Sequence, residues 1–252
     1  MATQATISNP PVSDEVADAL ELLGVARGRY DLKKLDGVRK VVAKRLTDAA
    51  RDIPHFPLVA HFAAEPLLTA RANYDAGEAG KVSVNDLLIA AVARALVAVP
   101  EVNASFTEHG IVSHHHADVA VAVAIPGGLV TPIVREADTK TVRQIAIEVR
   151  DLADRAKRKR LKPDEYNGGS FCISNLGMFG ISSFGSILNP PHGAILSVGA
   201  VEERVVPVDG APGIAKMMTL TLTCDHRVID GATGARWLQA LAASIADAGS
   251  LK

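Results

Sequence analysis

The sequence is poor in cysteine, in aromatic residues and in net charge, and each shortage excludes a class of protein. Its 252 residues include two cysteines, Cys172 and Cys224. Two are too few for a disulfide framework, and both lie in apolar runs, so we expect buried, reduced thiols. Only 4% of the residues are aromatic while 48% are hydrophobic, so we expect a core of Val, Ala, Leu and Ile. A formal net charge of -1 provides no field that would gather nucleic acid or anionic lipid.

Long apolar segments are also missing. No run approaches the roughly eighteen residues of a membrane span. Residues 1–11 are polar and do not resemble a signal peptide. We therefore expect a cytoplasmic protein without a membrane partner. The length fits one large domain or two small ones and is enough to bury a substantial core.

Helix-like and strand-like segments are mixed along the chain without a regular alternation. Apolar spacing, caps and prolines predict a short helix capped by Ser13 and helices over residues 37–50, 83–99 (capped by Ser83 or Asn85), 141–160 and 232–246. Apolar runs predict strands over residues 56–63, 118–125, 129–134, 171–174, 194–201 and 216–224, and the polar stretch 73–81 predicts a loop. This mixture predicts an α+β fold, a two-layer sandwich of a mixed β-sheet with helices on one side.

One stretch near the C-terminus carries residues suited to general-base chemistry. His226 follows an apolar strand-like run, and Asp230 comes four residues later, just before the last predicted helix. An imidazole at a strand end can be held rigidly and still face a cleft. The residues alone leave two alternatives open: His226 is a base, or His226 is a surface histidine and Asp230 caps the next helix.

Two other runs suggest binding sites at first sight. The basic run 155–162 lies at the end of a predicted helix, where cations complement the dipole, and no aromatic residues accompany it. We therefore interpret it as a solvated helix end. His114, His115 and His116 are adjacent in an extended segment, so their side chains alternate between faces, and no cysteine or carboxylate completes a tetrahedral set. We expect no metal and no nucleic acid.

The motif Asp-His-Arg-x-x-Asp-Gly at residues 225–231 resembles the signature of the dihydrolipoamide acyltransferases, the core components of 2-oxoacid dehydrogenase complexes, and of the distantly related chloramphenicol acetyltransferase. Other segments match in the family's order, over roughly residues 35–248: 38–46, 53–56, 84–86, 100–105, 128–134, 168–177 and 189–191. The resemblance implies a chloramphenicol acetyltransferase-like sandwich. We expect a catalytic domain over residues 35–252, preceded by a flexible segment, 1–34, with a short helix.

The resemblance also implies a reaction, the transfer of an acyl group between dihydrolipoamide and coenzyme A. His226 would take the proton of the attacking thiol, and Ser174 would donate a hydrogen bond to the oxyanion of the tetrahedral intermediate. Asp230 would form an ion pair with Arg39 that shapes the loop carrying the histidine. Residues 173–180 look more like members of pyruvate dehydrogenase complexes than like succinyl or branched-chain members, which favours acetyl.

Alternatives remain at each of these positions. On the residues alone, Ser174 is a strand-end serine, Arg39 is a charge on a helix face, and Cys224 is a weak candidate nucleophile because it lies within the apolar run. For the whole chain, the alternatives are a non-catalytic structural core and an acyltransferase of the same fold with a different acceptor. The presence of His226, Ser174 and Asp230 together favours catalysis.

The resemblance further implies an assembly. Family members form homotrimers in which the histidine of one chain faces the serine of the next, and trimers can build cages of 24 or 60 chains. Coenzyme A would enter the site as a substrate, and another domain or chain of the complex would supply the lipoyl group, because no lipoylation turn or subunit-binding module is present. Two departures stand out. Residues 245–252 are less apolar than the run of leucines with which family members dock into a neighbouring trimer of the cage. At position 192, histidine replaces the family's common Gln.

Overall fold

The computed structural model describes residues 13–75, 81–125, 128–208 and 210–251. The chain divides into two units, residues 1–43 and 44–252. Because this division rests on compactness, it does not test where the catalytic domain begins, and the boundary after residue 34 stays a prediction. Among the helices of the described ranges, none has the length and apolarity needed to cross a bilayer.

The first unit contains the predicted short helix. Helix α1 spans Asp14–Leu22, and helix α2, Gly37–Asp52, begins in this unit. Ser13 occupies the N-cap position of α1, but within the described residues its side chain makes no capping hydrogen bond. The helix is confirmed and its predicted cap is wrong. The segment after α1 is held instead by Arg27, which pairs with Asp14, Asp18 and Glu21.

The second unit is built on a six-stranded sheet with the order β1-β10-β9-β8-β4-β7. Its strands are β1 (His55–Ala63), β4 (Val119–Val121), β7 (Ile133–Val134), β8 (Phe171–Asn175), β9 (Ala194–Val208) and β10 (Ala211–Asp225). Strand β8 runs parallel to β4 and β9, and the other pairs are antiparallel. Two small sheets accompany it, β2 (Ala104–Thr107) with β3 (Gly110–Ser113), and β5 (Val123–Ile125) with β6 (Gly128–Val130).

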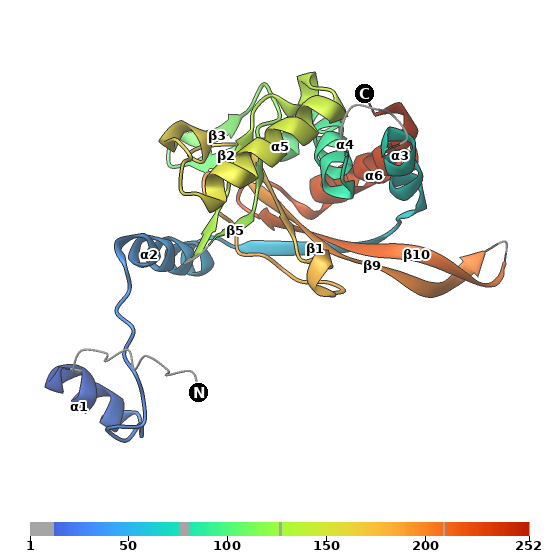
Figure 1. The fold of residues 1–252 in the computed structure, drawn as a ribbon. Helices are drawn as coiled ribbons and strands as arrows, with labels where there is room; N and C mark the ends of the chain where they lie inside the picture. The colour runs from blue at the N-terminus through green and yellow to red at the C-terminus, as the bar shows by residue number, and fades with distance from the viewer. Residues whose placement is uncertain (1–12, 76–80, 126–127, 209, 252) are drawn as a thin grey trace. The chain divides into compact units, whose positions relative to one another are not determined.

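Helices cover one face of the main sheet (Figure 1). They are α3 (Glu65–Asp75), α4 (Val84–Ala98), α5 (Val142–Lys157) and α6 (Gly231–Ala246), and short 3₁₀ turns are η1 (Pro100–Val102), η2 (Ala137–Thr139), η3 (Pro163–Glu165), η4 (Gly177–Phe179) and η5 (Ala248–Ser250). Ser83, not Asn85, caps α4, through a reciprocal capping box with Asp86. The predicted two-layer α+β sandwich is confirmed.

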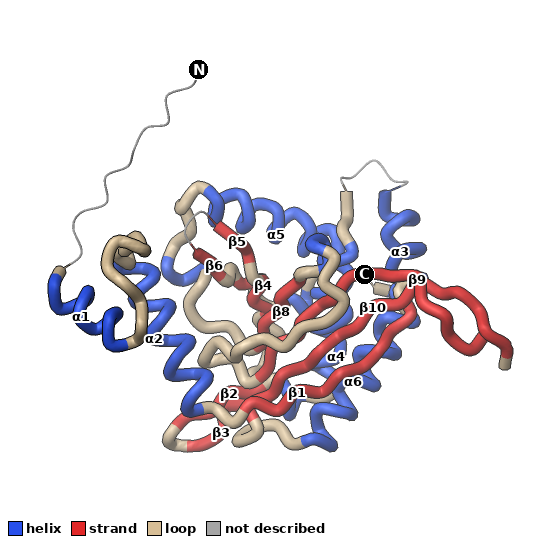
Figure 2. Tube along the Cα trace, turned by 90° about the horizontal axis from the view of Figure 1, so that it is seen from below, coloured by secondary structure: helices blue, strands red, loops and turns tan. Residues whose placement is uncertain are grey.

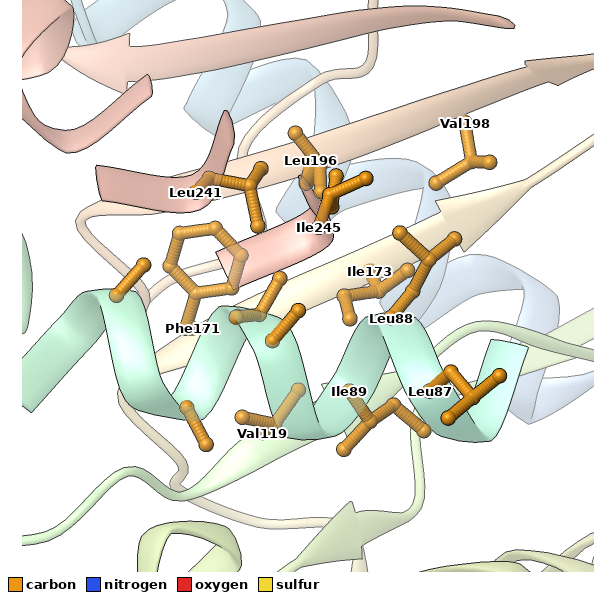
Figure 3. Packing of buried hydrophobic residues seen from close by; sticks show 14 of the residues in the cluster. Leu87, Leu88, Ile89, Val119, Phe171, Ile173, Leu196, Val198, Leu241 and Ile245 are labelled. Carbon is orange, nitrogen blue, oxygen red and sulfur yellow. The ribbon is translucent and has the colours of Figure 1, made fainter. Parts of the chain in front are cut away.

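The main core lies between α4, α6 and the helix-facing side of the sheet (Figure 3). Because successive strand residues point to opposite faces, Phe171 and Ile173 of β8 enter this core while Cys172 belongs to a cluster on the other face. An ideal Cβ at Gly234 would lie 2.5 Å from Leu58 Cδ1, so glycine lets α6 approach β1 closely. The core is aliphatic, as the composition predicts.

The other face of the sheet has an apolar part and a polar part, and the apolar part is a cluster that includes Cys172 and Ile195. Thr219, Thr221 and Thr223 of β10 are buried there. The Ser186 and Ser197 hydroxyls lie 2.7 Å apart and share a hydrogen bond, which ties the segment before β9 to this face. Figure 2, seen from below, shows loops crossing the strands. Loops thus lie over this face, and Ala49 of α2 packs into its apolar cluster.

Several predictions of secondary structure are wrong. The strands expected over residues 118–125 and 129–134 are each two strands that belong to different sheets. The chain leaves the main sheet at Ala122, whose N–H still donates to Ile173 O. Strands β9 and β10 are longer than predicted, because they continue to pair with each other beyond the end of β1 at Ala63.

Three elements were not anticipated: α3, whose last residues fall in the predicted loop 73–81, and the hairpin of β2 and β3. Residues 76–80 of that loop lie outside the described residues. These elements have few apolar residues in regular spacing, so their positions depend on contacts with the rest of the unit.

We predict that truncation within the core destabilises the protein far more than truncation on its helical surface. Leu88→Ala removes a side chain that is 0% exposed and should lower the free energy of unfolding by about 2–5 kcal/mol. Val97→Ala, on the same helix but 60% exposed, should change it by less than about 0.5 kcal/mol. Urea denaturation measures both values. Equal effects of the two substitutions would contradict the core described here.

Candidate active site

His226 stands in the turn between β10 and α6, and the start of β1 holds it. Its backbone N–H donates to Pro54 O at 3.0 Å. Its ring packs edge-on against Phe56, with 4.8 Å between the ring centroids. The register of β1 and β10, which pairs His55 with Asp225, brings these groups together. The imidazole is therefore supported on one side while the residue stays exposed.

The segment before Phe56 is itself fixed by a histidine. The His55 Nδ1–H donates to Ile53 O at 2.8 Å, and its Nε2 accepts from Leu188 N at 2.9 Å. These two bonds define the neutral tautomer of His55, because one ring nitrogen donates and the other accepts. His55 therefore anchors the strand end beneath His226 and is not available as a base.

The residues on both sides of His226 form an ion pair whose carboxylate is buried. The Asp225 side chain is only 4% exposed. Its carboxylate accepts from the Arg227 backbone N–H at 3.0 Å, from Nε at 2.9 Å and from Nη2 at 2.7 Å. The hydrogen bond to Asp225 raises the pKa of the Arg227 guanidinium. Neither residue has a role that the sequence alone predicts, although both stand in the motif.

Asp230 caps helix α6. Its Oδ1 accepts from the Thr233 backbone N–H at 2.7 Å, and this bond lowers the pKa of the Asp230 carboxyl. The capping role considered for Asp230 is thus confirmed. Arg39 belongs to the first unit, where its N–H donates to Asp36 Oδ1 at 2.7 Å. Its ion pair with Asp230 is not tested and stays a prediction.

Ser174 lies on the face of the sheet that points away from the main core. It follows Ile173 in β8, so its side chain points away from the helices, and it is paired with Ser197 of β9. Among the described residues its hydroxyl has no hydrogen-bond partner, and the residue is partly buried. An ideal Cβ at Gly177 would lie 2.8 Å from Gly199 O, so glycine lets the turn after β8 lie against β9. The hydroxyl is free to donate to an external acceptor.

His226 and Ser174 are far apart within one chain. Ser174 is level with Ser197, which is paired with Thr221 of β10, and β10 runs on to Asp225 before it reaches His226. At about 3.3 Å per residue and about 4.8 Å between strands, this register separates the two by roughly 15–20 Å. Two side chains at that separation cannot contact the same carbonyl group.

The cysteines are not nucleophiles. Cys172 and Cys224 are both buried free thiols. Burial raises the pKa of each to about 12, so neither forms a thiolate near neutral pH. The expectation of buried, reduced thiols is confirmed.

The two runs that suggested binding sites are engaged in the fold. His114 Nε2 lies 2.8 Å from Ser105 Oγ, and burial lowers the pKa of His114. In the basic run, Arg155 pairs with Asp151 and Glu165 at the end of α5. Within the described ranges, no group of three or more His, Cys, Asp or Glu residues is arranged to hold a metal.

His192, the departure noted in the sequence, is a buried structural residue. It is 3% exposed, and its Nε2–H donates to Gly168 O at 2.9 Å. In the described part of the chain its Nδ1 has no hydrogen-bond partner. Burial lowers the pKa of His192 to about 4, so the ring is neutral at physiological pH.

The sheet and the helices on it form a fold of the chloramphenicol acetyltransferase type. A solved chloramphenicol acetyltransferase shares the fold with a TM-score of 0.52, at 18% identity over 83% of this chain and 94% of that one. A family model, 2-oxoacid dehydrogenases acyltransferase (catalytic domain), matches residues 28–251. The chain belongs to this family, as the motifs predict.

Relatives place the chain more closely. It is 47% identical to the dihydrolipoyllysine-residue acetyltransferase component of the pyruvate dehydrogenase complex of Rhizobium meliloti (strain 1021), over 84% of this chain and 49% of that protein. The mitochondrial component of Caenorhabditis elegans is 44% identical, over 81% of this chain and 42% of that protein. The chain thus spans about half the length of the curated relatives that it matches.

Solved structures of the same family match nearly end to end. The dihydrolipoamide acetyltransferase of Azotobacter vinelandii has a TM-score of 0.84 at 30% identity, over 94% of this chain and 96% of that one. A probable dihydrolipoamide acetyltransferase of Listeria monocytogenes has a TM-score of 0.83 at 29% identity, over 89% and 97%.

We predict that His192 makes the fold sensitive to acid. Its pKa is about 4 in the folded state against 6.5 ordinarily, so the unfolded chain binds more protons between these values and stability falls as the pH drops through this window. Between pH 7 and pH 5 the loss should be on the order of 2 kcal/mol. The His192→Gln variant has no titrating group at this position. Its loss of stability between pH 7 and pH 5 should therefore be smaller than that of the wild type by about this amount. Urea denaturation of both proteins at both pH values tests this, and identical pH dependence would contradict it.

Proposed function

We propose that this chain is the catalytic core of a pyruvate dehydrogenase complex component and transfers an acetyl group between dihydrolipoamide and coenzyme A. The observation that carries the proposal is His226, exposed at the end of β10 and held by Pro54 O and the Phe56 ring. The relatives named as acetyltransferase components of pyruvate dehydrogenase complexes support acetyl as the acyl group.

The residue spacing supports the assignment of the site. The Azotobacter vinelandii enzyme was studied for the role of a serine, a histidine and an asparagine in its catalytic mechanism. In that chain the serine precedes the histidine by as many residues as Ser174 precedes His226, and the asparagine follows the histidine by four, as Asp230 does here. Asparagine and aspartate cap helices about equally well, so the capping contact of Asp230 does not require its charge.

The chemistry follows from these positions. The neutral imidazole of His226 takes the proton of the attacking thiol, and the thiolate sulfur bonds to the carbonyl carbon of the thioester. The resulting oxyanion accepts a hydrogen bond from the Ser174 hydroxyl. Collapse of the intermediate breaks the original carbon–sulfur bond, and the imidazolium returns its proton to the leaving sulfur.

The separation of His226 and Ser174 supports a site shared between chains. Within one chain the two residues are roughly 15–20 Å apart. His226 of one chain can therefore act on the same carbonyl group as a Ser174 only if that serine belongs to a neighbouring chain. We propose a homotrimer in which coenzyme A and a lipoyl group, carried by another domain or chain, meet between subunits. Similarity to a subunit of the cubic core of a pyruvate dehydrogenase multienzyme complex, with a TM-score of 0.82 at 30% identity, supports further assembly into a cage. Cytoplasmic location stays a prediction.

A non-catalytic structural core is the alternative. It requires neither an exposed base nor a free hydroxyl on the sheet, whereas the chain has both. Acyl transfer from acetyl, succinyl and isobutyryl coenzyme A to free dihydrolipoamide, followed by absorbance of the thioester product, separates the two functions. No transfer with any of the three donors would favour the structural core.

We predict that the base and the oxyanion donor contribute differently. His226→Ala should lower kcat by at least about 10³, because it removes the imidazole that takes the thiol proton. Ser174→Ala should lower kcat by on the order of 10² with little change in KM, because its hydrogen bond forms mainly in the transition state. Steady-state kinetics on samples shown to be folded measures both. Near wild-type activity of His226→Ala would rule out the mechanism.

We predict that the two inactive variants complement each other. When His226→Ala and Ser174→Ala chains are mixed and refolded together, some interfaces pair an intact histidine with an intact serine. Under random mixing about a quarter of the interfaces in a cyclic trimer do so, so activity should return to about a quarter of wild type. No activity in mixtures shown by native mass spectrometry to contain hybrid trimers would place both residues in one chain or exclude Ser174.

A further inference from the structure

The proposed mechanism uses His226 but leaves its neighbour Arg227 without a role. The Arg227 side chain is 32% exposed, and its guanidinium is engaged on two sides. On one side it donates to the carboxylate of Asp225. On the other side its central carbon lies 3.9 Å from the centroid of the Phe106 ring. Such a double contact fixes a long, otherwise flexible side chain in one rotamer.

The Asp225 carboxylate connects this arginine to the backbone of the turn. Besides the guanidinium it accepts the Arg227 backbone N–H, while Asp225 O accepts the N–H groups of Val228 and Ile229, each at 2.9 Å. The Asp225 N–H donates to Gly193 O at 2.9 Å. The backbone N–H, the backbone C=O and the carboxylate of Asp225 thus all form hydrogen bonds that shape the turn. His226 lies directly inside this set of bonds.

Phe106 belongs to a different part of the unit, the β2–β3 hairpin, which is not paired with the main sheet. The base of this hairpin lies against the start of β9, because an ideal Cβ at Gly193 would lie 2.2 Å from Ala104 O. Through Phe106 the hairpin reaches the turn that carries His226. The contact gives this small sheet a defined connection to the proposed site.

We propose that Arg227 is a positioning residue for acyl transfer: held between the Asp225 carboxylate and the Phe106 ring, it fixes the turn that directs His226 toward the reacting thiol. The proposal rests on the proposed function. Arg227 complements the contacts from β1, where Pro54 O and Phe56 hold His226 from the other side. Only a planar guanidinium can satisfy the carboxylate with two of its N–H groups and lie flat on an aromatic ring. Without it, Asp225 would be left as a buried charge lacking its partner.

A positioning role predicts a specific kinetic pattern. Arg227→Gln should lower kcat by about 10- to 100-fold and leave KM for coenzyme A and dihydrolipoamide within about threefold, because a misdirected base impairs the transition state rather than binding. Arg227→Lys keeps the charge without the planar fork and should recover part of the loss. Phe106→Leu keeps apolar bulk without the aromatic face and should lower kcat by about two- to fivefold, again with KM unchanged.

A double-mutant cycle tests whether Arg227 acts through Asp225. If it does, Asp225→Asn with Arg227→Gln should be no slower than the slower single variant, whereas independent roles would multiply the two losses. Hydrogen exchange of residues 225–230 gives a readout that does not depend on activity, and it should be faster in Arg227→Gln. Arg155→Gln is the matched control, since Arg155 also pairs with two carboxylates but lies on α5. It should leave kcat and this exchange unchanged.

The outcomes separate the two proposals. Loss of kcat at constant KM, with faster exchange in the turn, supports the positioning role. Wild-type kcat in Arg227→Gln overturns it, and so does a large rise in KM for coenzyme A with kcat intact, which would make Arg227 a substrate contact. If the wild-type protein itself transfers no acyl group, the proposed function fails. Hydrogen exchange then still tests whether Arg227 fixes the turn, and unchanged exchange in Arg227→Gln would show that it does not. If Arg227→Gln does not fold, Phe106→Leu and Arg227→Lys carry the test.

Discussion

The antiparallel pairing of β1 with β10 is the constraint on which the rest of the site depends. Its register sets His55 opposite Asp225, so the residues just before and within β1 meet the turn just after β10. From this one alignment follow the hydrogen bond between His226 N and Pro54 O and the contact between the His226 and Phe56 rings. A shift of one residue would turn every side chain of β1 to the opposite face. The aliphatic residues of β1 and β10 that pack in the core therefore also maintain the position of His226.

The two faces of the sheet differ in composition and in packing. The face toward α4 and α6 is closed by aliphatic packing and gives stability (Figure 3). The face opposite carries buried threonines and serines beneath loops, and Ser174 belongs to it. Burial of hydroxyl groups costs free energy unless they find partners. Ser197 and Thr219 have partners on this face, whereas in the described part of the chain Thr223 Oγ1 has none. The proposed mechanism assigns the Ser174 hydroxyl of this face to the oxyanion.

In the turn that carries His226, a buried charged group likewise depends on a partner. Removing Asp225 from water is unfavourable, and an ion pair with Arg227 compensates for this without adding much net stability. Its effect is geometric, because the carboxylate accepts both side-chain and backbone donors of its neighbour. Asp230 adds a helix cap at the other end of the turn. His226 is thereby held by its two neighbours in sequence and by contacts with Pro54 and Phe56, while the residue stays exposed.

The sequence by itself determined the fold class and the family, and it named His226 and Ser174 as candidates, because helical spacing, apolar runs and an ordered set of motifs are local properties of the chain. It could not show α3, the β2–β3 hairpin or the division of residues 118–125 between two sheets, since these depend on which distant segments pair. Nor could it assign roles to Phe56, Asp225 and Arg227, whose partners become visible only when β1, β10 and the hairpin meet. The tertiary structure alone decided that His226 and Ser174 lie at different levels of the sheet, because separation in space follows from strand register and not from the spacing of residues along the chain.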